Sequence, residues 1–290
     1  MIASLFVEQM LNGLQLGVML FLIAAGFTLV FGIMNLVNLA HGSFYMIGAY
    51  MFATILQKVG AFWVSIVLAA LVTGFVGAVL ERLALKPFYR RPYLDQVLAT
   101  LGLILFFNEL TRIIWGPQPL NVTLPGALNS SVPIIVGLSY PMIRLVILAV
   151  GVLVALALYL IISRTRAGML VRAGASNRVF IGALGINVNR VFSWAFSVGA
   201  ALAGLAGALA SPILAVEAGM GESVLIFALI VVVIGGIGSF RGAFVAAILV
   251  GLIDTFGRLM FPPLLGDISV YLLMAAILAW RPQGLFPAHG

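Results

Sequence analysis

Long, almost uncharged stretches of apolar residues limit what this chain can fold into. Nine of them stand at residues 10–33, 41–57, 61–83, 95–115, 141–163, 189–212, 222–240, 242–260 and 267–280. Several exceed the roughly 18 residues that mark a bilayer-spanning helix. In this chain 63% of the residues are hydrophobic and 8% are charged. In a typical soluble domain about 45–50% of the residues are apolar and about 25% are charged. The sequence predicts an all-α fold: a polytopic integral membrane protein with about eight to ten transmembrane helices, forming a single domain over residues 1–290.

The second and last stretches are short for a full bilayer crossing, so we expect these two helices to be tilted, broken or re-entrant. Glycines at helical spacing recur in other stretches, such as Gly13 and Gly17 or Gly199, Gly204 and Gly207. Helices in lipid associate through close backbone contact, which small residues permit. The glycines therefore predict a tightly packed helical core, without indicating what the protein carries.

Arginine and lysine residues cluster in two connecting segments. Segment 82–91 holds four of them and segment 164–190 holds five, whereas the proline-rich loop 116–140 holds none. Basic loops stay on the cytoplasmic side. We therefore expect a multi-pass protein of the bacterial cytoplasmic (inner) membrane, with an external loop 116–140 and a cytoplasmic C-terminus. The net charge of +7 is read as this orientation signal and not as a nucleic-acid interface.

Cysteine is absent, and the histidines are His41 and His289. Disulfides, thiol catalysis and cysteine or histidine metal clusters are thereby excluded, and the sequence predicts neither a cofactor nor a metal site.

A polar break separates the first two apolar stretches. It holds Asn35, Asn38, His41 and Ser43 but no lysine or arginine. Irregular backbone inside a membrane is tolerated where it is buried in protein or lines a water-filled cavity. These residues therefore either line the substrate pathway or form a hydrogen-bonded turn.

A second break holds Gly235, Gly236, Gly238 and Ser239. It lacks the Gly-Lys-Ser/Thr ending of a phosphate-binding loop. The glycines favour a sharp turn between two helices, and a substrate-pathway role is the alternative.

Some acidic residues lie inside or beside apolar stretches, where an ionisable group is costly. Glu109 is three residues from Arg112, and Asp254 is four residues from Arg258. Both spacings suit ion pairs on one helix face, so we expect local pairs. Glu217 and Glu222 are expected at the outer surface.

Residues 164–187 form a cytoplasmic segment with amphipathic character, in which apolar residues alternate with arginines. A helix of this kind can lie on the membrane surface or fit a groove on a partner protein. A passive channel has no obvious need for such a helix, whereas a permease driven by a separate motor does.

Three separated blocks point to a known family. They are residues 26–50 (GFTLVFGIMNLVNLAHGSFYMIGAY), the sequence from Arg166-Ala-Gly through Ala183-Leu-Gly-Ile-Asn187 to Gly207, and the C-terminal RPQGLF at 281–286. In order and spacing they resemble the LivH-type permease of branched-chain amino acid ABC importers, over essentially the whole chain.

The resemblance implies a second homologous permease subunit, two cytoplasmic ATPase subunits and a periplasmic substrate-binding protein as partners, with transport by alternating access. It makes 164–187 the coupling segment that docks on an ATPase. The coupling residues would be Arg166, Gly168, Arg172, Ala173, Asn177, Ala183 and Gly185. Family members often carry an acidic residue where Ser176 and Asn177 stand in this chain. The resemblance therefore does not extend to the polar docking contacts at these two positions. The chain itself shows no nucleotide site and is not expected to be an enzyme.

Other functions remain open at this stage. The same machine could carry urea, short amides or other amino acids. A stand-alone secondary transporter or channel would need its own coupling carboxylates or filter, and the few acids here look paired. An intramembrane enzyme is disfavoured because no His-Glu-x-x-His occurs and no serine has a histidine at helical spacing.

Overall fold

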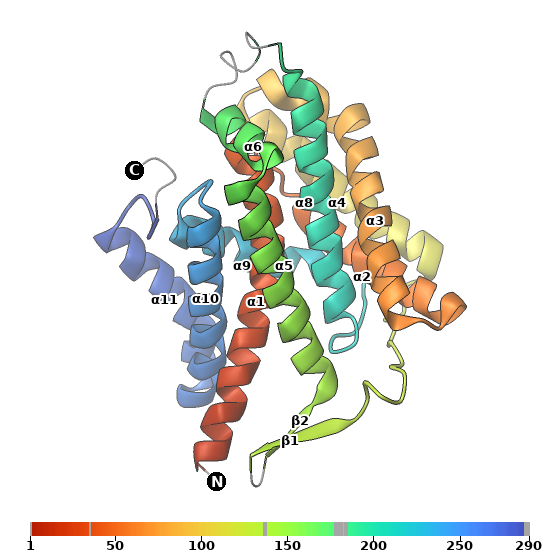
Figure 1. Ribbon diagram of the computed structural model, residues 1–290, viewed down its shortest axis with the longest axis vertical. Helices are drawn as coiled ribbons and strands as arrows, with labels where there is room; N and C mark the ends of the chain where they lie inside the picture. The colour runs from red at the N-terminus through yellow and green to blue at the C-terminus, as the bar shows by residue number, and fades with distance from the viewer. Residues whose placement is uncertain (1, 35, 136–137, 177–181, 183–184, 287–290) are drawn as a thin grey trace.

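The computed structural model describes residues 2–34, 36–135, 138–176, 182 and 185–286, and helices dominate it (Figure 1). The α-helices are α1 (Ile2–Met34), α2 (His41–Val59), α3 (Phe62–Leu80), α4 (Tyr93–Trp115), α5 (Met142–Arg164), α6 (Arg166–Ser176), α8 (Val188–Ala210), α9 (Met220–Gly235), α10 (Phe240–Met260) and α11 (Pro263–Trp280). A π-helical turn, Glu81–Leu85, and a 3-10 turn, Lys86–Arg90, prolong α3. An antiparallel hairpin of β1 (Ser131–Ile135) and β2 (Leu138–Pro141) precedes α5.

Each of the nine predicted stretches coincides with a helix, which confirms the all-α membrane fold. Six helices are long and apolar enough to cross a bilayer, and α9 and α11 are shorter apolar helices. The stretch predicted to run to residue 240 was too long: α9 ends at Gly235 because Gly236 takes a φ of 98°, which a helix cannot continue. The hairpin inside the predicted external loop was not foreseen.

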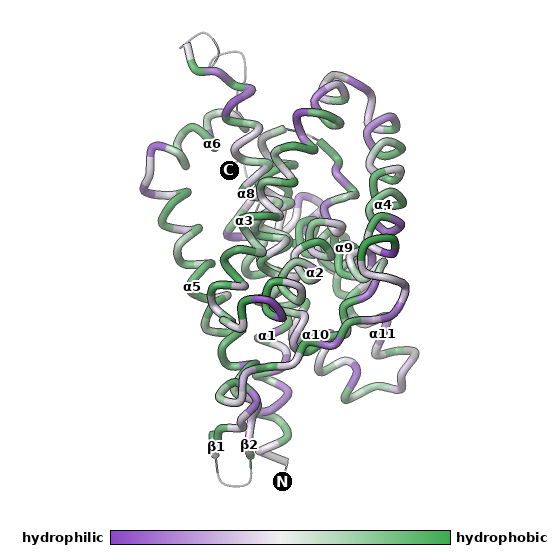
Figure 2. Tube along the Cα trace, turned by 90° about the vertical axis from the view of Figure 1, so that its right-hand side faces the viewer, coloured by the Kyte–Doolittle hydropathy of each residue, from purple (hydrophilic) through white to green (hydrophobic). Residues whose placement is uncertain are grey.

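The centre of the bundle is α2. Most of its residues are buried, including Tyr45 and Tyr50 at 1% exposure, and it packs against α1, α3, α8 and α9. Large apolar side chains point outward on α3, α4 and α5, where Phe75, Leu105 and Leu153 are more than 60% exposed. Figure 2 shows hydrophobic residues along the helix lengths and hydrophilic residues gathered toward the ends. The pattern is that of a bundle whose outer faces meet lipid.

Glycine contacts bring the helices together, which confirms the predicted tight core. Gly48 of α2 lies against the backbone of Gly204 of α8, and Gly13 and Gly17 of α1 lie against the α10 backbone around Gly251. A Cβ atom at any of these positions would lie within about 3 Å of the neighbouring helix. The helices therefore approach at backbone distance, as small residues allow in lipid.

The two ends of the bundle differ in chemistry. One end, here called the α6 end, carries both α6 and the turns that follow α3 (Figure 1). Both predicted basic segments belong to this end, since the ring of Tyr89 contacts that of Phe192 at 5.9 Å. The other end, called the hairpin end, carries β1, β2 and the start of α1. A cytoplasmic α6 end and an external hairpin end match the predicted orientation, which stays a prediction.

Candidate functional site

The first break leaves buried polar groups without hydrogen bonds. Asn38 and His41 are fully buried, and within the described part of the chain no partner hydrogen-bonds the Asn38 amide or the Thr28 hydroxyl. The Ile23 backbone faces the His41 ring, but neither ring nitrogen has hydrogen-bond geometry to any described group. A buried polar group left unpaired costs about 1–3 kcal/mol. Asn35 lies outside the described residues.

Two helices begin beside this break. Gly42, in the first turn of α2, touches the backbone of Gly221, in the first turn of α9. Buried Ser43 lines a small depression there together with Asn108 and Glu222. Asn108 Nδ2 donates to Glu222 Oε1 at 2.6 Å, which ties α4 to the start of α9. Helix N-termini carry partial positive charge, so this junction joins two positive helix ends to one carboxylate.

The second break is tightly packed. Ser239 caps α10 by accepting from the Gly242 backbone N–H at 3.1 Å, and Gly238 has a φ of 81°. The C-terminal segment 281–286 covers the end of α9, because the Leu285 and Phe286 N–H groups donate to the carbonyls of Ile234 and Gly235. Those carbonyls would otherwise be unpaired at a helix end.

The structure brings the two breaks to the same region of the bundle. A Cβ at Gly32, near the end of α1, would stand 3.0 Å from Gly238. A closely packed turn between α9 and α10 is enough to explain the residues of the second break, Gly235, Gly236, Gly238 and Ser239. Their role in a pathway stays a prediction.

The predicted amphipathic segment contains the separate helix α6. Its exposed side carries Arg166, Met169 and Arg172 at intervals of three residues, and Val171 is buried. Gly168 lies directly against the backbone of α5 near Ile162, so α6 is held closely at that point. Ala173 is partly buried, Gly185 takes a φ of 78°, and Asn177 and Ala183 lie outside the described residues.

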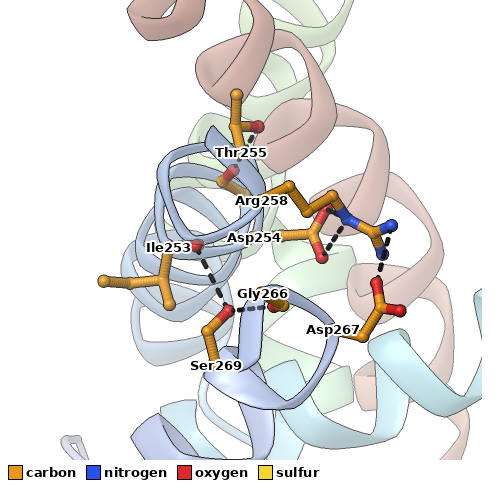
Figure 3. A network of polar contacts seen from close by, with 8 residues as sticks. Ile253, Asp254, Thr255, Arg258, Gly266, Asp267 and Ser269 are labelled. Carbon is orange, nitrogen blue, oxygen red and sulfur yellow. Dashed lines mark hydrogen bonds and ion pairs between the residues drawn. The ribbon is translucent and has the colours of Figure 1, made fainter. Parts of the chain in front are cut away.

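Both predicted ion pairs form. Arg112 lies 3.5 Å from Glu109, and Arg258 lies 3.1 Å from Asp254. Arg258 also pairs with Asp267 of α11 at 2.9 Å, so both carboxylates point to one guanidinium (Figure 3). Asp267 was missed because it lies on another helix, where the spacing to Arg258 gives no signal.

Glu81 was also missed. It stands next to Arg82 near the end of the predicted apolar stretch 61–83, where helical spacing offers no partner, yet it is 1% exposed. Tyr89 donates its hydroxyl to Glu81, and Ser193 Oγ donates to Glu81 Oε2 at 2.6 Å. Glu81 therefore links the turns after α3 to the start of α8.

Glu81→Ala is expected to lower folding stability by roughly 1–3 kcal/mol, because it removes the buried acceptor of two hydrogen bonds. Thermal unfolding in detergent, followed by intrinsic fluorescence, measures the change. Glu81→Gln, which keeps one carbonyl oxygen, should lose less. Glu109→Ala is the matched control because that side chain is 63% exposed. Equal midpoints for Glu81→Ala and the control would contradict the assigned role.

Taken together, the apolar helices and the glycine contacts between them define a polytopic α-helical membrane protein. A family model described as branched-chain amino acid transport system / permease component matches residues 9–278, so the chain belongs to this family of transport permease components. The family's members are named as permease subunits and not as enzymes.

Curated relatives resemble the chain over most of its length. The chain is 32% identical to the high-affinity branched-chain amino acid transport system permease protein BraD of Pseudomonas aeruginosa, covering 97% of this chain and 95% of that protein. It is 30% identical to the LivH permease protein of Escherichia coli, with the same coverage. It is 31% identical to the LivM permease protein of that organism, over 92% of this chain and 67% of LivM.

Proposed function

We propose that this chain is the transmembrane permease subunit of an ATP-driven importer that moves branched-chain amino acids across the inner membrane by alternating access. The observation that carries the proposal is the family match over residues 9–278. The names of the relatives BraD and LivH, both branched-chain amino acid permease proteins, indicate the cargo.

A second permease subunit completes the pathway. LivH and LivM of Escherichia coli are both named as permease proteins of a high-affinity branched-chain amino acid transport system, and this chain resembles both. Because this chain resembles both LivH and LivM, we infer that it pairs with a homologous permease subunit. A binding protein would dock at the hairpin end and release its amino acid between the two permeases.

The unpaired groups at the first break support alternating access. Asn38, His41 and Thr28 are buried without hydrogen bonds here, which is unfavourable by about 1–3 kcal/mol per group. A second conformation, in which they meet water or an amino acid, would offset that cost. Asn35, Asn38, His41 and Ser43 thus belong to the proposed inward pathway, with Gly235–Ser239 as the neighbouring turn.

Segment 164–187 is the proposed coupling element toward two ATPase subunits. The exposed stripe Arg166, Met169 and Arg172 offers one apolar and two charged anchors at helical spacing, a pattern that suits a groove on a partner. The close approach of Gly168 to α5 would pass a push on α6 directly to a membrane helix.

Transport in vesicles tests this function. The chain is co-expressed with the genes beside its own, reconstituted, and assayed for ATP-dependent uptake of labelled leucine with and without the binding protein. We expect uptake that requires both ATP and the binding protein. Leucine moving down its gradient through this chain alone would replace the proposal with a channel or secondary carrier. ATP hydrolysis without leucine uptake would keep the assignment as an ATP-driven importer and would require a different substrate.

A further inference from the structure

A cavity of about 460 Å³ opens at the hairpin end, between the first half of α1, the start of α5 and the second half of α10. Its volume falls within the roughly 300–1,000 Å³ that is usual for small-molecule sites. The ion pair of Asp254 and Arg258 borders this space, which has no role in the proposed function.

One wall of the cavity presents a positive charge. Arg144, at the start of α5, donates to Asn12 Oδ1 at 2.6 Å, and the Tyr140 hydroxyl donates to the same oxygen at 2.8 Å. Burial raises the pKa of Tyr140, which keeps this hydroxyl a donor. Within the described residues no carboxylate lies at ion-pair distance from Arg144. Its guanidinium is therefore oriented by a neutral amide and remains available to an anion.

The α10 side of the cavity presents a buried carboxylate. Asp254 on α10 is 7% exposed and lines the cavity. Its partner Arg258 is shared with Asp267 (Figure 3). Arg258 also lines the cavity, and it divides its single positive charge between Asp254 and Asp267, so the charge of Asp254 is only partly compensated. An acid buried at a membrane helix is costly and is a functional candidate by default.

The remaining lining combines apolar side chains with the polar Gln9, Gln15 and Thr255. Leu16 and Met19 of α1 face the cavity, together with Ile213 and Leu214 from the connection after α8. The cavity thus offers a guanidinium, a carboxylate and aliphatic side chains in one place.

We propose that this cavity is an entry site for a free zwitterionic aliphatic α-amino acid, with the carboxylate on Arg144, the ammonium on Asp254 and the side chain on Leu16, Met19 and Ile213. The inference rests on the proposed function and deepens it by giving the amino acid a site at the hairpin end, separate from the first break. Charge-assisted hydrogen bonds of this kind are stronger than neutral ones, so the two charged contacts would select against ligands that lack either group.

Equilibrium binding of labelled leucine to the purified complex in nanodiscs, without ATP or binding protein, tests the site. Two analogues each lack one charge: leucinamide lacks the carboxylate, and 4-methylpentanoate lacks the ammonium. Unlabelled leucine should displace the label about tenfold better than either analogue. This comparison uses the unaltered protein and so does not depend on the folding of any variant.

Variants then assign each charge to a residue. Arg144→Gln should weaken leucine binding about tenfold and change leucinamide binding much less, because leucinamide has no carboxylate to pair with Arg144. Asp254→Asn should weaken leucine and leave 4-methylpentanoate unchanged. Arg112→Gln is the matched control, since Arg112 also lies near a helix end but pairs with exposed Glu109; it should bind all three ligands normally.

Several results would overturn the assignment. Equal loss of leucine and leucinamide in Arg144→Gln would show a merely structural role. Weaker leucine binding in discs that contain phosphatidylethanolamine than in discs without it would assign the cavity to a lipid headgroup of the same charge pattern. If the unaltered complex imports leucine while both variants bind leucine normally, the entry site fails and the proposed function stands. If the unaltered complex neither imports nor binds leucine, both fail.

Discussion

Gly48→Ala is expected to abolish the folded protein. Gly48 sits in the middle of the central helix α2, where a Cβ atom would collide with both the Cα and the carbonyl of Gly204 on α8. These obstacles are backbone atoms, which no side-chain rotation can move aside. Overpacking typically lowers folding stability by about 1–3 kcal/mol and occasionally by more. For a collision with backbone atoms at the centre of the bundle we expect a loss of about 3 kcal/mol or more. Size-exclusion chromatography of a fluorescent fusion in detergent measures the folded, monodisperse fraction.

Gly102→Ala is the matched control for this prediction. Gly102 is also a helical glycine, on α4, but it is exposed and a Cβ there would meet nothing within 4 Å. Alanine is the better helix former by about 1 kcal/mol in water, so this variant should behave like the unaltered chain. A Gly48→Ala protein that elutes and melts like Gly102→Ala would contradict the packing described for α2 and α8.

Reversing the charges of the exposed α6 stripe, with Arg166→Glu and Arg172→Glu together, is expected to stop ATP-driven uptake while leaving the protein folded. Both side chains are exposed, so their replacement leaves the α5–α6 packing intact. If α6 docks in an ATPase groove, like charges at two anchors should weaken the contact by about tenfold or more. Leucine uptake and co-purification of the ATPase subunits measure the effect.

Arg82→Glu and Lys86→Glu form the control pair for α6. These residues are basic and exposed at the same end of the bundle but lie outside α6. The control should keep most of the uptake. Equal loss in the two pairs would assign the effect to the overall charge of the α6 end, and normal uptake in the α6 pair would refute the coupling role.

Hydropathy predicted the helices well because transfer into lipid depends on each residue's own surface. The nine apolar stretches became helices for this reason, and the pairs Glu109–Arg112 and Asp254–Arg258 followed from spacing within one helix. The predicted stretch ran past the end of α9 because hydropathy is averaged over many residues. The helix ends at a single residue, where Gly236 takes a positive φ.

The candidate sites were harder to predict. Asn38 and His41 stood out as polar residues in an apolar context, but their lack of hydrogen bonds depends on what surrounds them. Glu81 was hidden because its partner Ser193 is far away in sequence. The cavity at the hairpin end combines Asn12, Arg144 and Asp254, which share no sequence pattern.

The amino-acid sequence was enough to predict a multi-pass helical membrane protein with two basic connecting segments and an amphipathic helix between membrane spans. Those properties follow from local composition and from the 3.6-residue helical period. The central position of α2, the contact of Gly48 with Gly204 and the opposite charges that line one cavity became visible in the three-dimensional arrangement. Which helices become neighbours depends on how all the surfaces fit together at once, and no single segment carries that information.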